Sequence, residues 1–410
     1  MSDKGKVSAT DEKKQRISRR GFVAGAGAAA LSFTLIKPEL AHGAAANSKI
    51  DLGIIGCGNR GTWIARLFQK HGGYNIVAGA DYFQDRVERF GKIFKSSSTR
   101  LYTGLSCYRR LLEQKLDAVA IESPPYFHPE QAAAAVDAGR HVYLAKPIAV
   151  DVPGCQSIAE SGKKAAANKL CFLADFQTRA DDLYREAVKR VHNGEIGRIV
   201  SGEATYQTGR LGAKAEPGTA EARLRNWVFD KALSGDIITE QNIHALDVAT
   251  WILDGNPLRA YGTGGRKIRT DVGDCWDHFA VIYTFPNDVL LSFSSKQCGI
   301  GYDDILCRVY GSEGTIDTHY TATVSITGKN PYEGGSVGNL YTNGAVTNVA
   351  DFYENVTRGR FSNATVAPSV CSNLTTILGR TAAYGRKEVT WDEMMSSNEK
   401  LEADLEGLKA

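Results

Sequence analysis

The stretch Ile50-Asp51-Leu52-Gly53-Ile54-Ile55-Gly56-Cys57-Gly58-Asn59-Arg60-Gly61 decides the fold of this chain. It reads as a buried strand that runs into a glycine loop and then into a helical segment from Trp63 to Lys70. Gly56 permits a tight turn, Gly58 lets the backbone approach a pyrophosphate, and Gly61 lets helix and strand pack closely. The helix N-terminus adds free amides and positive potential, so this stretch predicts a site for a phosphate-bearing nucleotide.

A second predicted strand, Asn75 to Ala80, ends in Asp81. An acidic side chain at that distance from the glycine loop accepts hydrogen bonds from ribose hydroxyls and repels a 2′-phosphate. We therefore expect NAD as cofactor rather than NADP, with Asn59 and Arg60 of the loop among its contacts. The alternative is that Asp81 is an ordinary turn residue at the end of a strand.

Strands and helices continue to alternate along the chain. Leu116 to Ile121 and His141 to Leu144 read as strands, and Pro129 to Ala138 reads as a helix. This order predicts an α/β protein with a doubly wound parallel sheet. Because ligands bind at the carboxyl ends of such strands, we expect two segments to border the nicotinamide. They contain the residues Ser123, Pro124, His128 and Lys146.

The length and the net charge of the chain limit the number of domains and the classes of binding partner. A chain of 410 residues predicts two domains. The formal net charge is +3, but residues 1–46 hold eight basic and four acidic side chains, which leaves −1 on the remainder. A near-neutral body gives no electrostatic footprint for nucleic acid or an anionic membrane.

Residues 1–46 read as an export leader. Ser18-Arg19-Arg20-Gly21-Phe22 precedes an apolar run to Ile36, and small residues follow from Ala41 to Ala46. The run is shorter than the roughly 20 residues that span a bilayer. We expect a twin-arginine signal, the corresponding export machinery as a partner, no membrane insertion and a periplasmic or otherwise exported protein. The alternative is a chance arginine pair before a buried helix.

The eight cysteines show neither C-x-x-C nor a Cys/His spacing typical of metal ligands. We expect no metal site. Buried free thiols are the favoured interpretation, although an exported protein could pair some of them.

Several motifs together resemble the Gfo/Idh/MocA oxidoreductases. They are Gly56 to Gly61, Asp117-Ala118-Val119 with Ser123-Pro124 and His128, Ala138 to Pro147, Asn193 to Gly197, Glu240-x-x-x-His244-x-x-Asp247, and Gly311 to Ile316. The resemblance implies a Rossmann domain, placed at residues 47–170, and an α/β domain at residues 171–410. The second domain would carry a large open, mostly antiparallel sheet, whose exposed face would make a homodimer or homotetramer.

One departure concerns the lysine motif. Where the family usually has Glu-Lys-Pro, this chain has Ala145-Lys146-Pro147. The lysine is kept, and it is our candidate for the base that takes the hydroxyl proton during hydride transfer. Burial and a nearby cationic nicotinamide would favour its neutral amine. The alternative is a surface lysine after an edge strand.

His244 is the second candidate for proton handling. In a predicted helix from Thr239 to Trp251, opened by Thr239 as cap, the side chains of Glu240, His244 and Asp247 share one face. Asp247 or Glu240 would orient the imidazole toward a substrate hydroxyl.

Four further residues are candidates for ligand contacts near the domain junction. Gln177 is expected at the cofactor, and Arg179, Asn226 and Trp227 are expected at the substrate, where amide, guanidinium and aromatic groups suit a sugar ring. Lys146, Glu240 and His244 would also contact the substrate. A structural ion pair for Arg179 and a core position for Trp227 are the alternatives.

The remainder of the second half is expected to form strands at Ile199 to Tyr206, Ala260 to Thr263, Cys275 to Phe285, Val289 to Ser295, Ile305 to Tyr310 and Gly314 to Asp317. Their alternation predicts one covered face and one interface face. We expect a loop from Thr327 to Thr347 and helices at Ala350 to Thr357 and Ser372 to Gly385.

The sequence thus predicts an exported NAD-dependent oxidoreductase that acts on a secondary alcohol of a sugar, polyol or glycoside. Redox-assisted glycoside cleavage with a tightly bound, recycled NAD is an alternative that some relatives imply. A non-catalytic sugar-binding module is a more distant one.

Overall fold

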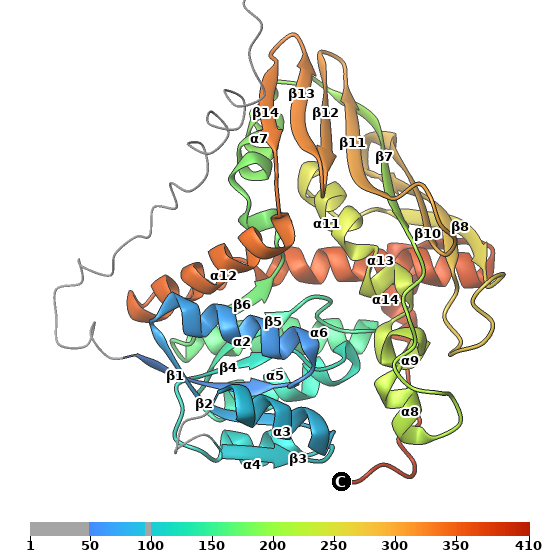
Figure 1. Cartoon of the computed structure of the whole chain (residues 1–410). Coiled ribbons are helices and arrows are strands. Elements are labelled where there is room, and N and C mark those ends of the chain that lie inside the picture. Colours follow the sequence, from blue (N-terminus) through green and yellow to red (C-terminus); the bar gives the residue numbers. More distant parts are fainter. Residues whose placement is uncertain (1–48, 95–99) are drawn as a thin grey trace, which may run out of the picture. The chain divides into compact units, whose positions relative to one another are not determined.

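The computed structural model describes residues 49–94 and 100–410. The proposed leader, residues 1–46, lies outside them. The described residues form one compact unit and build one six-stranded and one nine-stranded sheet (Figure 1).

The first sheet, called the Rossmann sheet, has the strand order β3-β2-β1-β4-β5-β6, and all neighbouring strands are parallel. Its strands are β1 (Ile50–Ile55), β2 (Tyr74–Asp81), β3 (Arg100–Thr103), β4 (Ala118–Ile121), β5 (His141–Ala145) and β6 (Phe172–Asp175). The order reverses between β1 and β4, so a ligand is expected at the carboxyl ends beside this pair. The doubly wound sheet predicted from the sequence is confirmed.

Helices cover both faces of the Rossmann sheet, as a parallel sheet requires. They are α2 (Asn59–His71), α3 (Gln84–Ile93), α4 (Cys107–Leu112), α5 (His128–Asp137), α6 (Val152–Ala167) and α12 (Leu340–Thr357). On one face, Phe68 of α2 packs against Phe352 of α12 and against Tyr143 of β5. A segment from the end of the chain therefore completes the first domain's core.

The second sheet, called the large sheet, has the order β14-β13-β12-β11-β7-β10-β9-β8-β15. Its strands are β7 (Ile199–Thr208), β8 (Arg259–Gly265), β9 (His278–Phe285), β10 (Val289–Gln297), β11 (Asp304–Gly311), β12 (Gly314–His319), β13 (Thr323–Gly328), β14 (Tyr332–Ser336) and β15 (Glu388–Thr390). Only β7 and β10 pair in parallel among the described strands of this sheet. This is the mostly antiparallel sheet that the resemblance implied.

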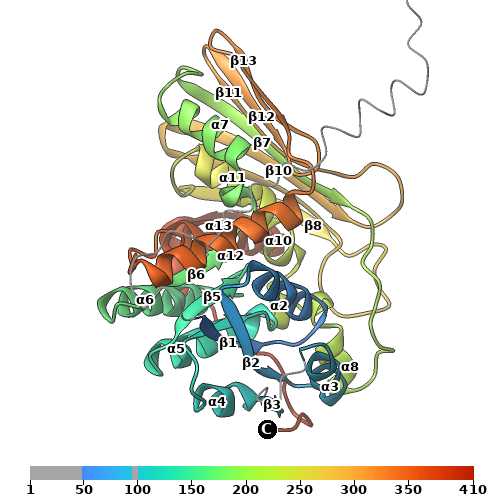
Figure 2. The same ribbon diagram turned by 60° about the vertical axis from the view of Figure 1, so that its left-hand side comes forward.

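Helices α7 (Asp182–His192), α11 (Ile243–Ile252) and α13 (Val366–Gly385) lie on one face of the large sheet (Figure 2). The other face is open, and side chains alternate between the two. In β10, Leu291 is fully buried while its neighbour Leu290 is 48% exposed. The remaining helical segments are α8 (Ala220–Arg225), α9 (Lys231–Ser234), α10 (Ile237–Glu240), α14 (Trp391–Ser397), η1 (Pro125–Phe127), η2 (Thr178–Ala180), η3 (Trp227–Phe229) and η4 (Pro286–Asp288).

The prediction of a loop from Thr327 to Thr347 is wrong. This stretch contains the end of β13, all of β14 and the first turns of α12. The glycine-rich β14 is held at the sheet edge by its ladder with β13, and Asn339 caps α12 by accepting a hydrogen bond from the Thr342 amide at 3.2 Å. Tertiary pairing and a cap outweigh a composition typical of loops.

Two boundaries also differ from expectation. Strand β6 pairs with β5, so the Rossmann sheet continues beyond the boundary placed at residue 170. The single helix expected from Thr239 to Trp251 is two helices, since α10 ends at Glu240 and α11 begins at Ile243. Thr239 caps neither, because it lies inside α10, which Asp236 caps, and Asn242 stands at the N-cap of α11. Glu240 and His244 therefore lie on different helices.

Candidate active site

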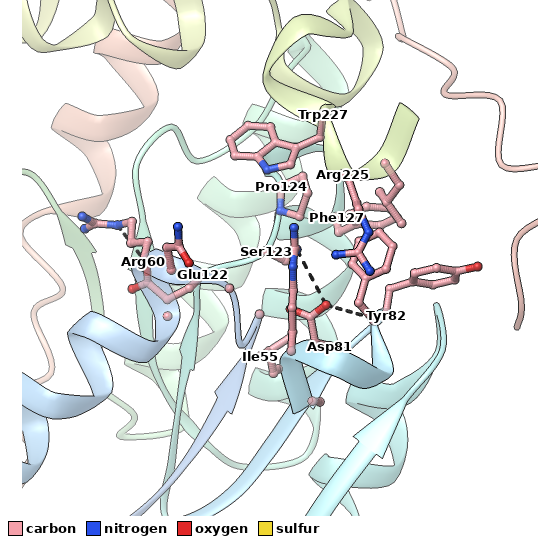
Figure 3. A pocket seen from close by; sticks show the side chains of 18 of the residues that line it. Ile55, Arg60, Asp81, Tyr82, Glu122, Ser123, Pro124, Phe127, Arg225 and Trp227 are labelled. Atoms are coloured by element: carbon pink, nitrogen blue, oxygen red, sulfur yellow. Dashed lines mark hydrogen bonds and ion pairs between the residues drawn. The ribbon is translucent and has the colours of Figure 1, made fainter. Parts of the chain in front are cut away.

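A cavity of about 490 Å³ opens at the carboxyl ends of β1, β2 and β4 (Figure 3). The glycine loop and the ends of β2 and β4 line one side, and Arg225 and Trp227 line the other. It reaches Glu240 and Gln241 at the junction with the large sheet. Its position is the one that a doubly wound sheet provides for a dinucleotide.

The glycine loop is shaped for backbone approach. Gly56 has a φ of +96°, and a Cβ there would overlap the backbone of Glu122 and Ser123. A Cβ on Gly61 would overlap the carbonyl oxygen of Gly56. Gly58 stands at the N-cap of α2 without a side-chain cap, so the first amides of the helix stay available for a phosphate. The residues fit a dinucleotide.

Asp81 lies where a ribose-binding carboxylate is expected, but it also anchors the loop. Its carboxylate accepts hydrogen bonds from the amides of Cys57 at 2.8 Å and Phe83 at 3.0 Å. Arg86 is 3.8 Å away. Asp81 is 6% exposed and lines the cavity, and burial raises the pKa of this carboxyl. Asn59 lines the same cavity and accepts a hydrogen bond from Arg89 at 3.3 Å.

Ser123 and Pro124 form the cavity wall after β4, as expected (Figure 3). His128 does not reach the cavity. Its ring nitrogens lie 2.7 Å from the carbonyl oxygen of Ser123 and 2.8 Å from that of Pro147. His128 was predicted to contact the cofactor. In the structure it instead links Ser123, in the cavity wall after β4, to Pro147, in the segment after β5, and so has a positioning role.

Lys146 follows β5 at the domain junction, where its side chain is 12% exposed, next to Glu240 of the cavity lining. Its Nζ donates a hydrogen bond to the carbonyl oxygen of Glu240 at 2.6 Å and lies 3.8 Å from Glu240 Oε1. Burial lowers the pKa of Lys146, and the charge of Arg60 acts in the same direction, whereas Glu240 opposes it. A buried amine with a lowered pKa is suited to take up a proton near neutral pH.

His244 of α11 is buried, and it is near enough to Lys146 for that charge to act on its ring. Its ring packs 5.1 Å from that of Tyr320 and 6.5 Å from that of Tyr206. Burial, and then the charges of Lys146 and Arg60, hold the pKa of His244 well below its usual range. Its Nδ1 has no hydrogen-bond partner among the described residues, so the neutral ring is free to bond a ligand hydroxyl.

Asp247 does not orient His244, contrary to expectation. Its carboxylate accepts hydrogen bonds from Arg179 Nε at 2.9 Å and from the Ser372 hydroxyl at 2.6 Å. Arg179 is further held over the ring of Trp251 at 5.1 Å. The alternative of a structural ion pair for Arg179 therefore describes it better than a substrate contact.

Of the other candidates at the domain junction, two have hydrogen-bond partners within the protein and one lines the cavity. Gln177 is fully buried and donates to Asp175. Asn226 accepts from the amides of Lys214 and Ala215. Neither lines the cavity. Trp227 does, on the side opposite the glycine loop, where it faces Pro124 (Figure 3).

The structure adds a charged cluster that the sequence reasoning missed. Arg60 lines the cavity, where it was expected, and also bridges Glu122 after β4 to Asp175 at the end of β6. Its Nη1 also donates to the Tyr341 hydroxyl at 2.9 Å. The available signal was a charged residue directly after the buried strand Ala118–Ile121, the same signal that identified Asp81.

Comparison with known proteins agrees with this geometry. The family described as "Oxidoreductase family, NAD-binding Rossmann fold" matches residues 50–171, and the "GFO/IDH/MocA C-terminal domain" matches residues 184–317. Together they cover more than half of the chain, which therefore belongs to the Gfo/Idh/MocA family of NAD-dependent oxidoreductases.

Individual relatives are distant. Inositol 2-dehydrogenase 2 of Saccharopolyspora erythraea is 25% identical over 279 residues, 67% of this chain and 75% of the relative. The structure of myo-inositol 2-dehydrogenase from Lactobacillus plantarum has a TM-score of 0.67 at 23% identity, covering 84% of this chain and 99% of that one. Levoglucosan dehydrogenase with NADH and levoglucosan gives 0.69 at 18%, with the same coverage.

The described residues hold no helix long and apolar enough to cross a membrane. All eight cysteines fall within them and are unpaired, six of them buried, so the interpretation as free thiols is confirmed.

Proposed function

We propose that this protein oxidises a secondary alcohol of a sugar, polyol or glycoside. The carrying observation is that Glu240, which lines the dinucleotide cavity, holds the amine of Lys146 at its carbonyl oxygen, and that the charge of this amine acts on the buried ring of His244. The Oε2 of Glu240 has no hydrogen-bond partner among the described residues. Polar groups without partners, next to the rings of Tyr206 and Tyr320, suit a hydroxylated ring. The inositol and levoglucosan dehydrogenases to which the chain is similar support this substrate class.

The chain's own residues handle the proton. Bound NAD supplies the hydride acceptor. The neutral amine of Lys146 takes the hydroxyl proton as the carbon loses its hydride, so that alcohol becomes ketone and the proton resides on Nζ. His244 hydrogen-bonds the same oxygen, and Glu240 holds the amine in place through its carbonyl oxygen at 2.6 Å.

The test is product analysis on a panel of inositols, sugars and glycosides. NADH accumulation with one of them, stoichiometric with a ketone, supports the dehydrogenase. Failure to reduce NAD with any member, by a protein that binds NAD, would contradict it.

A second activity, redox-assisted glycoside cleavage with retained NAD, is favoured by the cover over the cavity. Arg225 pairs with Asp85 at 2.6 Å and stacks over Phe83 at 3.9 Å. The C-terminal tail bonds the same rim, since Lys409 donates to the Tyr82 hydroxyl and accepts from the Leu105 amide. These contacts would slow cofactor exchange. Cleaved glycoside without added NAD would support this activity.

Export through the twin-arginine route fits such a retained cofactor, because that route carries folded proteins. We also propose that the open face of the large sheet makes a homodimer or homotetramer. Its exposed side chains include Tyr261, Ile282, Leu290 and Tyr310, and apolar side chains gathered on one exposed face are typical of a protein–protein interface. Light scattering of the purified protein measures the oligomeric state, and a monomer at micromolar concentration would contradict the interface.

A further inference from the structure

Glu122 is a buried carboxylate with an unusual set of partners. Its side chain has no exposed surface, and it lines the dinucleotide cavity beside Gly56 and Ser123 (Figure 3). Arg60 Nε lies 2.9 Å from Oε2. Neither carboxylate oxygen takes a hydrogen bond from any other described residue. A buried carboxylate ordinarily has several donors, since burying it without them is costly.

Asp175 shows what a structural carboxylate looks like at the same place. It ends β6, one strand beyond the strand of Lys146, and it is also fully buried. In addition to Arg60, it accepts hydrogen bonds from Asn348 at 2.7 Å and from Gln177 at 3.2 Å. Side chains of the fold donate hydrogen bonds to the carboxylate of Asp175, whereas the carboxylate oxygens of Glu122 remain available as acceptors for a ligand in the cavity.

Arg60 is held in place by contacts other than its ion pair with Glu122. Its guanidinium lies 5.5 Å from the ring centres of both Trp63 and Tyr341, which stack on each other at 4.7 Å. The junction holds three carboxylates, those of Glu122, Asp175 and Glu240, against the guanidinium of Arg60. Burial lowers the pKa of Lys146 and keeps His244 neutral, so neither group adds a full positive charge in its neutral form. The local charge is therefore negative on the side of the cavity where β4 and β5 end.

That side is where a dinucleotide places its nicotinamide, because Asp81 at the end of β2 marks the adenosine half. Oxidised nicotinamide is a cation, and reduced nicotinamide is neutral. We propose that Glu122 determines which redox form of the cofactor this site holds, and that its charge makes the site bind NAD⁺ more tightly than it binds NADH. This inference rests on the nucleotide site described above.

The consequence concerns the balance of the proposed reaction. A site that stabilises the oxidised ring makes the bound cofactor a stronger reductant, so the hydride is readily returned to a keto intermediate. This favours a cofactor that is reduced and reoxidised in place over one that leaves as NADH.

The experiment measures dissociation constants of the nucleotide-free, full-length protein for NAD⁺ and NADH by calorimetry at pH 8.5, where the carboxyl of Glu122, with a pKa of about 7, is ionised. We expect Glu122→Gln to shift the ratio of the two constants about tenfold toward NADH, the size of one pKa unit of charge interaction. Asp85→Asn is the matched control, because it removes a carboxylate at the adenosine end of the same cavity and should leave the ratio unchanged. Glu122→Asp keeps the charge and should keep the preference.

Equal weakening of both forms by Glu122→Gln would overturn the proposal, since it would mean that Glu122 only hydrogen-bonds a group common to both. A measurement on the wild-type protein needs no variant: the midpoint potential of the bound nicotinamide should lie below that of free NAD. A potential at or above the free value would also overturn the proposal. Binding of neither nucleotide would instead contradict the nucleotide site itself.

Discussion

Replacement of Lys146 by methionine tests the proposed chemistry most directly. Methionine keeps the length and apolar packing of the side chain, so the change is confined to the amine. The structure gives two losses: the 2.6 Å hydrogen bond to the Glu240 carbonyl oxygen and the charge 3.8 Å from Glu240 Oε1. A hydrogen bond from a charged donor contributes about 1.5–3 kcal/mol, so we expect the free energy of unfolding to fall by no more than that.

Turnover should fall much further. A positioned base contributes about 10²–10⁴-fold, which corresponds to about 3–5 kcal/mol in the activation barrier. The assay is single-turnover reduction of bound NAD by the substrate found in the panel, followed by absorbance, with nucleotide content measured per chain. Lys163→Met, at an exposed position of α6 paired with Glu160, is the control and should behave as wild type.

The pH profile distinguishes a base from a residue that merely supports the site. The base must be neutral to act, and burial lowers the pKa of Lys146. The wild-type rate should therefore rise with pH along a limb that lies below the ordinary titration range of lysine. Lys146→Met should lose that limb. Turnover near the wild-type rate, or an unchanged limb in the variant, would refute the reasoning.

Four further predictions follow from other parts of the chain. Asp81→Ala should weaken the binding of NAD and reduce the ratio of its affinity to that of NADP in titrations, because it removes both the anchor of the loop and the charge that repels a 2′-phosphate. Arg225→Gln should speed NAD dissociation, measured by stopped-flow exchange, severalfold or more, because it opens the pair with α3; an unchanged rate would mean that the cover does not limit exchange. Burial raises the pKa of Glu122 to about 7, so the native state holds this proton above the unfolded pKa of roughly 4.5, and stability falls as pH rises from there toward 7. The stability of Glu122→Gln relative to wild type should accordingly increase by about 3 kcal/mol over that range in denaturant titrations; a constant difference would contradict it. Finally, Arg19→Lys with Arg20→Lys should keep the precursor in the cytoplasm on fractionation, and normal export would point to another route.

The fold was largely predictable because its signals are local. An apolar strand, three glycines at fixed spacing and Asp81 define a βαβ unit within some thirty residues, and Gly56 and Gly61 each have a steric reason in the structure. The edge strand β14 and the start of α12 were not predictable. Their glycines, asparagines and threonines are held by a neighbouring strand and a helix cap, which composition does not report.

The site was predictable where function requires a residue at the end of a strand. Lys146 meets that condition, and Glu240 and His244 were found by the family motif. Arg179 and Asn226 were misassigned for one reason: a polar side chain looks available until its partner is known. Asp247 lies far along the chain from Arg179, and its carboxylate forms an ion pair with that guanidinium. Long-range pairing of this kind cannot be read from spacing.

The charges at the strand ends form a series that no single motif shows. In the order of the sheet, β2 ends in Asp81, β4 is followed by Glu122, β5 by Lys146, and β6 ends in Asp175. The carboxylate at β2 is bonded by backbone amides and marks the adenosine half. Among the described residues, the carboxylate after β4 pairs with Arg60 at the cavity wall. Burial lowers the pKa of the amine after β5, which favours its neutral form. Parallel strands bring these ends to one edge of the sheet, where the dinucleotide binds. Two charge effects are therefore placed on neighbouring strands: the carboxylate of Glu122 acts on the nicotinamide ring, and the amine of Lys146 acts on the hydroxyl proton.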